Sequence, residues 1–340
     1  MPQRKNGSMD KNTSAVKQYN HTLDFVRGIL IILVVIGHVI RNSVPRYIIY
    51  SFHMPLFLFL LGYLIRNEAG KGYLVKKAKR LLIPFATASA FYFVWWSFFT
   101  PGVNVLRLLA SMVLAPPHHM WFLYSAFFHY LFIYAAILLQ QKRKSNIWPA
   151  VTCVAILLFI LSKWIQPYTF FEAKRTFGFF LFTLAGFLYR HNLLPALKRT
   201  KDLFKSNPLH GAIPFSLFLF FITAQYVLDS SVAGFPLLAV TYSFPSYLLF
   251  GLANLALGLF VARMFEQHTA FYLPLTNNIG ENSLVVYLYH FIVFQIAILY
   301  LKTQFAIILL SIIIPLALNA LLKKYRWYRL VVLGDAEHSL

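Results

Sequence analysis

The chain is poor in charge, and especially in acidic side chains. Only 12% of its 340 residues are charged, and Asp and Glu together number 10. A soluble domain carries about 25% charged residues, so an ordinary soluble protein is excluded. The sequence has no HExxH, P-loop or GxGxxG motif and no visible carboxylate pair, so nothing in it predicts a zinc protease, a nucleotide-binding domain or a glycosidase.

Cysteine is nearly absent too. The only one, Cys153, lies within an apolar run. A single cysteine excludes an intramolecular disulfide and provides no metal site, and we expect no metal cofactor. We expect Cys153 to be a small buried hydrophobic residue, with a covalent thioester role as the less favoured alternative.

Long apolar runs dominate what remains. Hydrophobic residues make up 59% of the chain and the mean hydropathy is +0.64. Because about 20 apolar residues cross a bilayer, the runs predict an all-α, polytopic transmembrane helix bundle with about ten spans. The expected spans are Leu23–Ile40, Tyr47–Ile65, Leu81–Phe99, Met120–Leu139, Ile147–Ile165, Phe177–Tyr189, His210–Leu228, Ser246–Phe265, Ser283–Tyr300 and Gln304–Leu322.

The net charge of +21 could indicate nucleic-acid binding, but the distribution of the charges argues against it. Most Lys and Arg residues fall in every second loop, which is how positive-inside membrane proteins are oriented. We therefore expect both termini in the cytoplasm, the lipid bilayer as a partner, no nucleic acid, and a multi-pass protein of the cell membrane. The expected division is a polar N-terminal segment (1–22), a membrane domain (23–325) and a short tail (326–340).

The first span carries a polar stripe. Asp24, Arg27 and His38 share one side of an otherwise apolar helix, because eleven residues make about three turns and rise about 16 Å. Polar residues are costly in a membrane, so the stripe predicts an internal functional cavity. The alternative is an interfacial arginine and a histidine that bonds a neighbouring helix.

The same segment resembles a known family. LDFVRG, with His38 eleven residues after Arg27, is similar to the first-helix motif of the acyltransferase 3 family of integral-membrane O-acyltransferases, in a branch resembling fucose 4-O-acetylases. Further segments resemble later motifs of the family: FHMPLFLFLLGYLI (52–65), KKAKRLLIPF (76–85), HMWFL (119–123) and GENSLVVYLYH (280–290). Two positions depart from the family pattern. Lys77 stands where the first Arg of an RxxR element is expected, and Leu61 replaces a small polar residue.

Orientation sorts the polar residues by depth. Arg27, Lys77 and Arg80 fall at the cytoplasmic side, the latter two where an inner loop meets the third span. His38 and His53 fall in the outer half of the membrane. The residues expected at the outer surface are His118, His119 and Trp121. Tyr287 and His290 are expected in the inner to middle part of the ninth span.

The resemblance implies transfer of an acetyl group from cytoplasmic acetyl-CoA to a hydroxyl of a carbohydrate or lipid-linked glycan. Cationic side chains would hold the phosphates of the acyl-CoA, and a histidine would serve as general base. The expected roles are cofactor binding by Arg27, Lys77 and Arg80, catalysis by His38 and His53, substrate binding by Trp121, Tyr287 and His290, and a structural i,i+3 partner for Arg27 in Asp24.

Two other function classes stay open. A transporter or flippase of a polar or lipid-linked metabolite would need coupling residues at mid-membrane, and membrane carboxylates are nearly absent. A non-catalytic membrane scaffold would leave the polar stripe of the first span unexplained. Glycan acetylation by a His38→Ala variant separates the three.

Overall fold

The computed structural model describes residues 20–40, 44–68, 70–99, 102, 104–114, 116, 118–165, 172–199, 209–233, 243–267 and 271–334. All regular elements in these ranges are helices. In chain order they are α1 (His21–Val39), α2 (Val44–Leu64), α3 (Lys71–Phe99), α4 (Val105–Leu114), the short η1 (His118–Met120), α5 (Trp121–Arg143), α6 (Trp148–Ser162), α7 (Ala173–Leu188), the π-turn η3 (Tyr189–Leu193), α8 (Leu194–Arg199), α9 (Leu209–Ala233), α10 (Phe244–Gln267), α11 (Pro274–Glu281), α12 (Ser283–Tyr300), α13 (Gln304–Leu322) and α14 (Arg326–Val331).

Each of the ten expected spans coincides with a helix. Eight of these helices are long and apolar enough to cross a membrane. The other two, α6 and α7, have 15 and 16 residues. The prediction of an all-α polytopic bundle is therefore confirmed. The expected polar N-terminal segment lies, except for its last three residues, outside the described residues.

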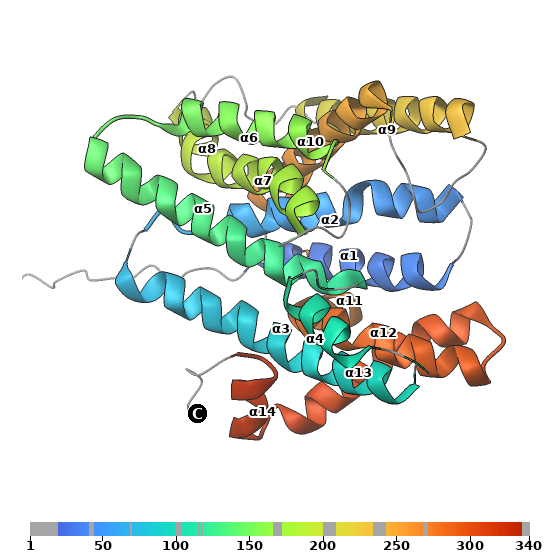
Figure 1. The fold of residues 1–340 in the computed structure, drawn as a ribbon. Helices are drawn as coiled ribbons and strands as arrows, with labels where there is room; N and C mark the ends of the chain where they lie inside the picture. The colour runs from blue at the N-terminus through green and yellow to red at the C-terminus, as the bar shows by residue number, and fades with distance from the viewer. Residues whose placement is uncertain are drawn as a thin grey trace, which may run out of the picture.

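The helices pack around a central pair. Helices α1 and α2 run side by side through the middle of the bundle (Figure 1). On one side, α2 packs against α7 and α10, which in turn contact α6 and α9. On the other side, α1 packs against α11, α12 and α13, while α3 joins α5 and α12. The polar stripe of α1 thus lies inside the bundle rather than facing lipid.

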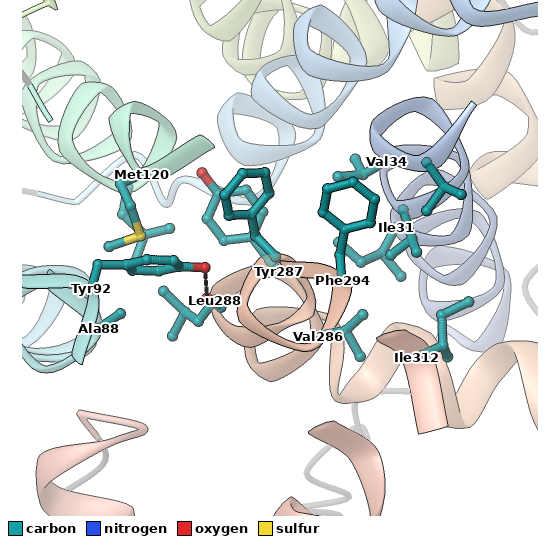
Figure 2. Packing of buried hydrophobic residues seen from close by; sticks show 14 of the residues in the cluster. Ile31, Val34, Ala88, Tyr92, Met120, Val286, Tyr287, Leu288, Phe294 and Ile312 are labelled. Atoms are coloured by element: carbon teal, nitrogen blue, oxygen red, sulfur yellow. Dashed lines mark hydrogen bonds between the residues drawn. The ribbon is translucent and has the colours of Figure 1, made fainter. Parts of the chain in front are cut away.

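Helix α12 sits at the centre of the second group. Figure 2 shows its side chains meeting residues of α1, of α3 and of the turn before α5. Tyr92 of α3 is almost fully buried, and its hydroxyl donates a hydrogen bond of 3.1 Å to the Leu288 carbonyl (Figure 2). Buried packing of this kind fixes the rotation of α12 and hence the direction of its polar residues.

The bundle exterior is apolar, as a lipid-facing surface requires. Large hydrophobic side chains on α3, α4, α9, α12 and α13 are exposed, among them Phe98, Leu299 and Phe305. A soluble protein rarely exposes this much contiguous apolar area, whereas lipid tails accept it.

Three expectations need correction. Helix α3 begins at Lys71, ten residues before the expected span, so Lys77 and Arg80 lie on a continuous helix instead of in a loop. Cys153 is exposed on α6 because the whole outer face of that helix is apolar and faces lipid, so it is not a core residue. Helix α9 continues to Ala233, past the expected end of the seventh span at Leu228, so Asp229 lies within the helix.

Candidate functional site

Three histidines from separate parts of the chain meet inside the bundle. His38 comes from the end of α1, His119 from η1 and His290 from α12. The His38 ring centroid lies 5.2 Å from that of His290 and 6.1 Å from that of His119. The centroids of His119 and His290 are 4.9 Å apart. We refer to these three residues as the histidine cluster.

The hydrogen bonds of His290 determine which of its nitrogens carries the proton. Its Nδ1 lies 2.9 Å from the carbonyl oxygens of both Val286 and Tyr287. Carbonyls only accept, so Nδ1–H is the donor and Nε2 of the neutral ring keeps its lone pair. Nε2 is buried and has no hydrogen-bond partner among the described residues. It therefore offers an acceptor inside the cluster.

His119 is held between two tyrosines. The Tyr92 hydroxyl lies 3.4 Å from His119 Nε2, and the Tyr287 hydroxyl donates to the His119 carbonyl. His119 was expected at the outer surface, but η1 folds inward and only 5% of the residue is exposed. The side chain of His118 lies outside what the structure describes.

Tyr50 links the cluster to α2. Its hydroxyl lies 3.4 Å from His38 Nδ1, close enough to orient the imidazole. Gly37 permits this approach, because a Cβ at that position would lie 2.9 Å from the Tyr50 ring. The Arg46 guanidinium carbon, one turn earlier on α2, lies 5.2 Å from the centroid of the same ring. His53 contacts Tyr50, at 5.1 Å between ring centroids, and its Nδ1 lies 2.6 Å from the Ile49 carbonyl.

Sequence reasoning missed Tyr50 and Arg46, although a signal existed. Arg46 is an arginine at the expected outer end of a span, where the positive-inside pattern disfavours it. Tyr50 follows it by four residues and therefore lies on the same helix face. Together they indicate a polar face on α2 that points toward α1.

His129 has a different character. It is fully buried on α5, its Nε2 lies 2.7 Å from the Thr176 carbonyl and its Nδ1 lies 2.8 Å from the Thr183 hydroxyl. The Nε2–H must donate to the carbonyl, so Nδ1 accepts from Thr183. Both nitrogens are occupied in joining α5 to α7, which makes His129 a structural residue.

The expected cofactor residues gather at the other end of α1. Arg27 lies in the first half of α1, and Lys77 and Arg80 lie one turn apart on α3. The Lys77 ammonium lies 5.4 Å from the Tyr73 ring centroid and 5.3 Å from that of Tyr130, a residue of α5. We call Arg27, Lys77 and Arg80 the cationic cluster.

Asp24 lies beside this cluster. Its carboxylate is buried and lies 3.5 Å from an Arg27 nitrogen, an i,i+3 pair on α1. The Arg27 side chain remains 34% exposed. The pair thus fixes the stem of Arg27 while leaving part of its guanidinium accessible to a phosphate.

Trp121 and Tyr287 lie next to the histidine cluster on its α5 side. The Arg175 guanidinium, from the start of α7, lies 5.1 Å from the Trp121 ring centroid and donates to Glu172 at 2.9 Å. Trp121 is buried, which shows that it packs within the bundle.

A metal site is not found in the parts of the chain that the structure describes, since no group of three His, Cys, Asp or Glu side chains there has a geometry that could hold an ion. The three histidines of the cluster are included in that statement.

Comparison with known proteins adds the remaining information. A segment covering 13% of this chain is 48% identical to the nodulation protein NolL of Sinorhizobium fredii, and it spans only 15% of that relative. No solved structure matches the chain. The family model described as an acyltransferase domain matches residues 20–324, which include the histidine and cationic clusters. The chain therefore belongs to this acyltransferase family, as a multi-pass membrane acyltransferase.

Proposed function

We propose that this acyltransferase moves an acetyl group from cytoplasmic acetyl-CoA to a hydroxyl of a cell-envelope or exported glycan, within the cell membrane, with His38 as general base. The observation that supports the proposal best is the meeting of His38, His119 and His290 inside a bundle of acyltransferase type. The similarity of the sequence motifs to fucose 4-O-acetylases supports a sugar hydroxyl as acceptor.

The cationic cluster suits the phosphates of coenzyme A. Arg27 and Arg80 offer planar guanidiniums that can bind phosphate oxygens in pairs, while Lys77 adds a point charge. Residues 27 and 38 lie on one continuous helix, about 16 Å apart along its axis. A pantetheine arm laid along α1 would carry the thioester from the cationic cluster toward the histidine cluster.

The transfer step needs a base on the acceptor hydroxyl. His38 removes the hydroxyl proton as the oxygen attacks the thioester carbonyl carbon, and a tetrahedral oxyanion forms. The carbon–sulfur bond then breaks, the ester carbonyl re-forms, and the proton held by His38 passes to the departing thiolate. The products are an acetyl ester and free coenzyme A.

The hydrogen bonds of the cluster prepare this step. For His38 to act through Nε2, its Nδ1 must carry a proton and donate it to the Tyr50 oxygen, 3.4 Å away. The lone pair on His290 Nε2 provides a second acceptor close to His38. Once His38 has taken the hydroxyl proton, its Nε2–H can donate a hydrogen bond to the lone pair of His290 Nε2, which would stabilise the imidazolium.

The test measures acetyl transfer to glycan by membranes that hold matched amounts of wild type and His38→Ala. Loss of a general base lowers the rate by about 10²- to 10⁴-fold. His129→Ala is the matched control, because its histidine is structural: the folded fraction should fall, while the rate per folded molecule is kept. Unchanged transfer by His38→Ala at equal protein levels would contradict the proposed function.

A further inference from the structure

Glu172 carries a buried acceptor atom that the bundle leaves unused. Only 1% of the residue is exposed. Its Oε2 accepts a hydrogen bond of 2.9 Å from Arg175. Its Oε1 is buried and has no hydrogen-bond partner among the described residues. Buried carboxylate oxygens are nearly always hydrogen-bonded in folded proteins, so an unpartnered one indicates a place for a donor from outside the chain.

The local backbone does not explain this atom. Glu172 is the residue before α7, where an acidic side chain commonly caps the helix, yet its side chain makes no capping bond. Its φ of +48° places it in the left-handed region, which is rare for a residue with a side chain. Burial raises the pKa of the Glu172 carboxyl, and the Arg175 guanidinium opposes that change. The carboxylate is thus held out of water, with one oxygen paired to Arg175 in the first turn of α7 and the other unpaired among the described residues.

A row of contacts leads from Glu172 to the histidine cluster. Arg175, paired with Glu172, lies 5.1 Å from the Trp121 ring centroid. The Trp121 ring centroid lies 6.2 Å from that of Phe122, which lies 5.5 Å from that of Tyr287. The Tyr287 hydroxyl donates to the His119 carbonyl. Packed side chains therefore connect Glu172 and Arg175 to the histidine cluster.

We propose that Glu172 and Arg175, flanked by Trp121, form a subsite that binds the sugar ring of the acceptor. Glu172 Oε1 accepts a hydrogen bond from a sugar hydroxyl, and Arg175 donates to ring or hydroxyl oxygens beside it. The inference rests on the proposed function, since it places the reacting hydroxyl at His38.

The chemistry of the subsite favours a sugar over other acceptors. A simple alcohol has one hydroxyl, which is engaged at His38, and it leaves Glu172 Oε1 without a donor. An anionic acceptor would be repelled by the buried carboxylate. A sugar supplies several hydroxyls that both donate and accept, which matches a carboxylate and a guanidinium side by side. Sites built to bond a hydroxyl discriminate strongly against ligands that lack it.

The test uses full-length enzyme in lipid nanodiscs with acetyl-CoA as donor. The acceptors are hexyl glucoside, hexyl galactoside and hexyl fucoside, compared with 1-hexanol, which has the same tail and no sugar. Wild type should acetylate at least one glycoside with kcat/KM about ten-fold above that for 1-hexanol. Glu172→Gln keeps the side-chain size, but its amide can turn a donor where Oε1 accepted. It should remove most of that ten-fold preference and leave 1-hexanol transfer and the acetyl-CoA KM unchanged.

Two further variants make the test decisive. Lys174→Gln removes a neighbouring charge at the start of α7 and should leave the preference intact. Trp121→Phe keeps the pair of Glu172 and Arg175 and serves as the test if Glu172→Gln does not fold. This variant should lower kcat/KM for the glycosides and leave that for 1-hexanol unchanged. Equal loss on glycosides and 1-hexanol, or a wild type that prefers no glycoside, overturns the subsite alone. A wild type that acetylates none of the acceptors overturns the proposed function as well.

Discussion

At the scale of single residues, Tyr50 is the position on which the chemistry of His38 depends most directly. Its hydroxyl is 3.4 Å from His38 Nδ1. Tyr50→Phe removes the group that would accept the Nδ1 proton and keeps the ring that packs against Gly37. We expect kcat for acetyl transfer to fall about ten-fold, with the acetyl-CoA KM unchanged. Initial rates at varied acetyl-CoA measure both constants.

A matched control for this change is Tyr300→Phe, at a highly exposed position at the end of α12. It should keep wild-type kcat. If Tyr50→Phe kept it as well, Tyr50 would have no part in orienting His38.

The sequence revealed some site residues and concealed others for one physical reason. Arg27 and His38 could be found because a helical period relates them within one segment. His119 and Tyr50 could not be placed, because their positions depend on how η1 and α2 pack against α1. His290 was expected at a different depth from His38. The contact between their rings depends on the tilt and rotation of α12, which hydropathy does not encode.

At the scale of elements, helix α3 presents the cationic cluster. Arg80 lies one turn after Lys77 on this helix, so both face the Tyr130 side of α5. A charge-assisted hydrogen bond contributes about 1.5–3 kcal/mol. Arg80→Gln should therefore raise the acetyl-CoA KM about ten- to a hundred-fold, with little change in kcat, in transfer assays at varied donor concentration.

Neighbouring positions on α3 provide the comparison. Lys76→Gln, at an exposed position of the same turn, should leave the KM near its wild-type value. Lys77→Arg should keep or lower it, because a guanidinium binds phosphate bidentately. An equal rise in Arg80→Gln and Lys76→Gln would mean that these charges act only through membrane orientation.

The junction of α2 with the end of α7 should respond to pH. The His191 ring, just beyond α7, has its Nε2 2.8 Å from the Ile65 carbonyl. Burial lowers the pKa of His191 below its ordinary 6.5, the bond to Ile65 opposes this, and Arg190 adds to it. The unfolded chain therefore binds a proton at His191 more readily than the folded chain does. The folded state is most stable above pH 6.5 and loses stability as the pH falls through that value.

Thermal unfolding in detergent between pH 7.5 and 5.5 measures this effect. The melting temperature of the wild type should decrease more over that pH range than that of His191→Gln, which has no titrating group at position 191. Parallel losses in the two proteins would assign the acid sensitivity elsewhere.

The helices themselves were predictable, and their ends were not. Hydropathy located a helix at each of the ten expected spans, eight of them long and apolar enough to cross a membrane, because lipid imposes length and composition together. It placed the start of the third span at Leu81, whereas α3 begins at Lys71. The extra turns are polar, and Tyr73 and Lys77 within them contact Tyr130 of α5, so hydropathy alone could not reveal them.

At the scale of the whole molecule, the C-terminal segment braces the cationic cluster. The Val331 carbonyl accepts a hydrogen bond from Thr87 of α3. Gly334 has a φ of +63°, and a Cβ there would lie 2.6 Å from the Lys79 carbonyl oxygen and 3.0 Å from the Arg80 Cα. Residues 254 positions apart in the chain thus meet where the donor phosphates would bind.

Gly334→Ala should disturb this contact twice, through backbone strain and through overlap with α3. Strain of about 1 kcal/mol or more should raise the acetyl-CoA KM about five-fold and affect kcat less. The control is Gly72→Ala on the same helix α3, where a Cβ meets nothing within 4 Å. Transfer assays at varied acetyl-CoA compare the two variants. An unchanged acetyl-CoA KM in Gly334→Ala would mean that the C-terminal segment has no role in donor binding.

Helix α1 carries a residue of each cluster on one uninterrupted run from His21 to Val39. Substitution of the apolar residues of α1 changes neither the axial spacing of Arg27 and His38 nor the angle between them around the helix. A single inserted or deleted residue between them changes both, by about 1.5 Å and 100°. If the two clusters serve one acyl-CoA molecule, this stretch can vary in composition but not in length. Indels should then be tolerated in the loops around α1 and excluded from its eleven-residue interval.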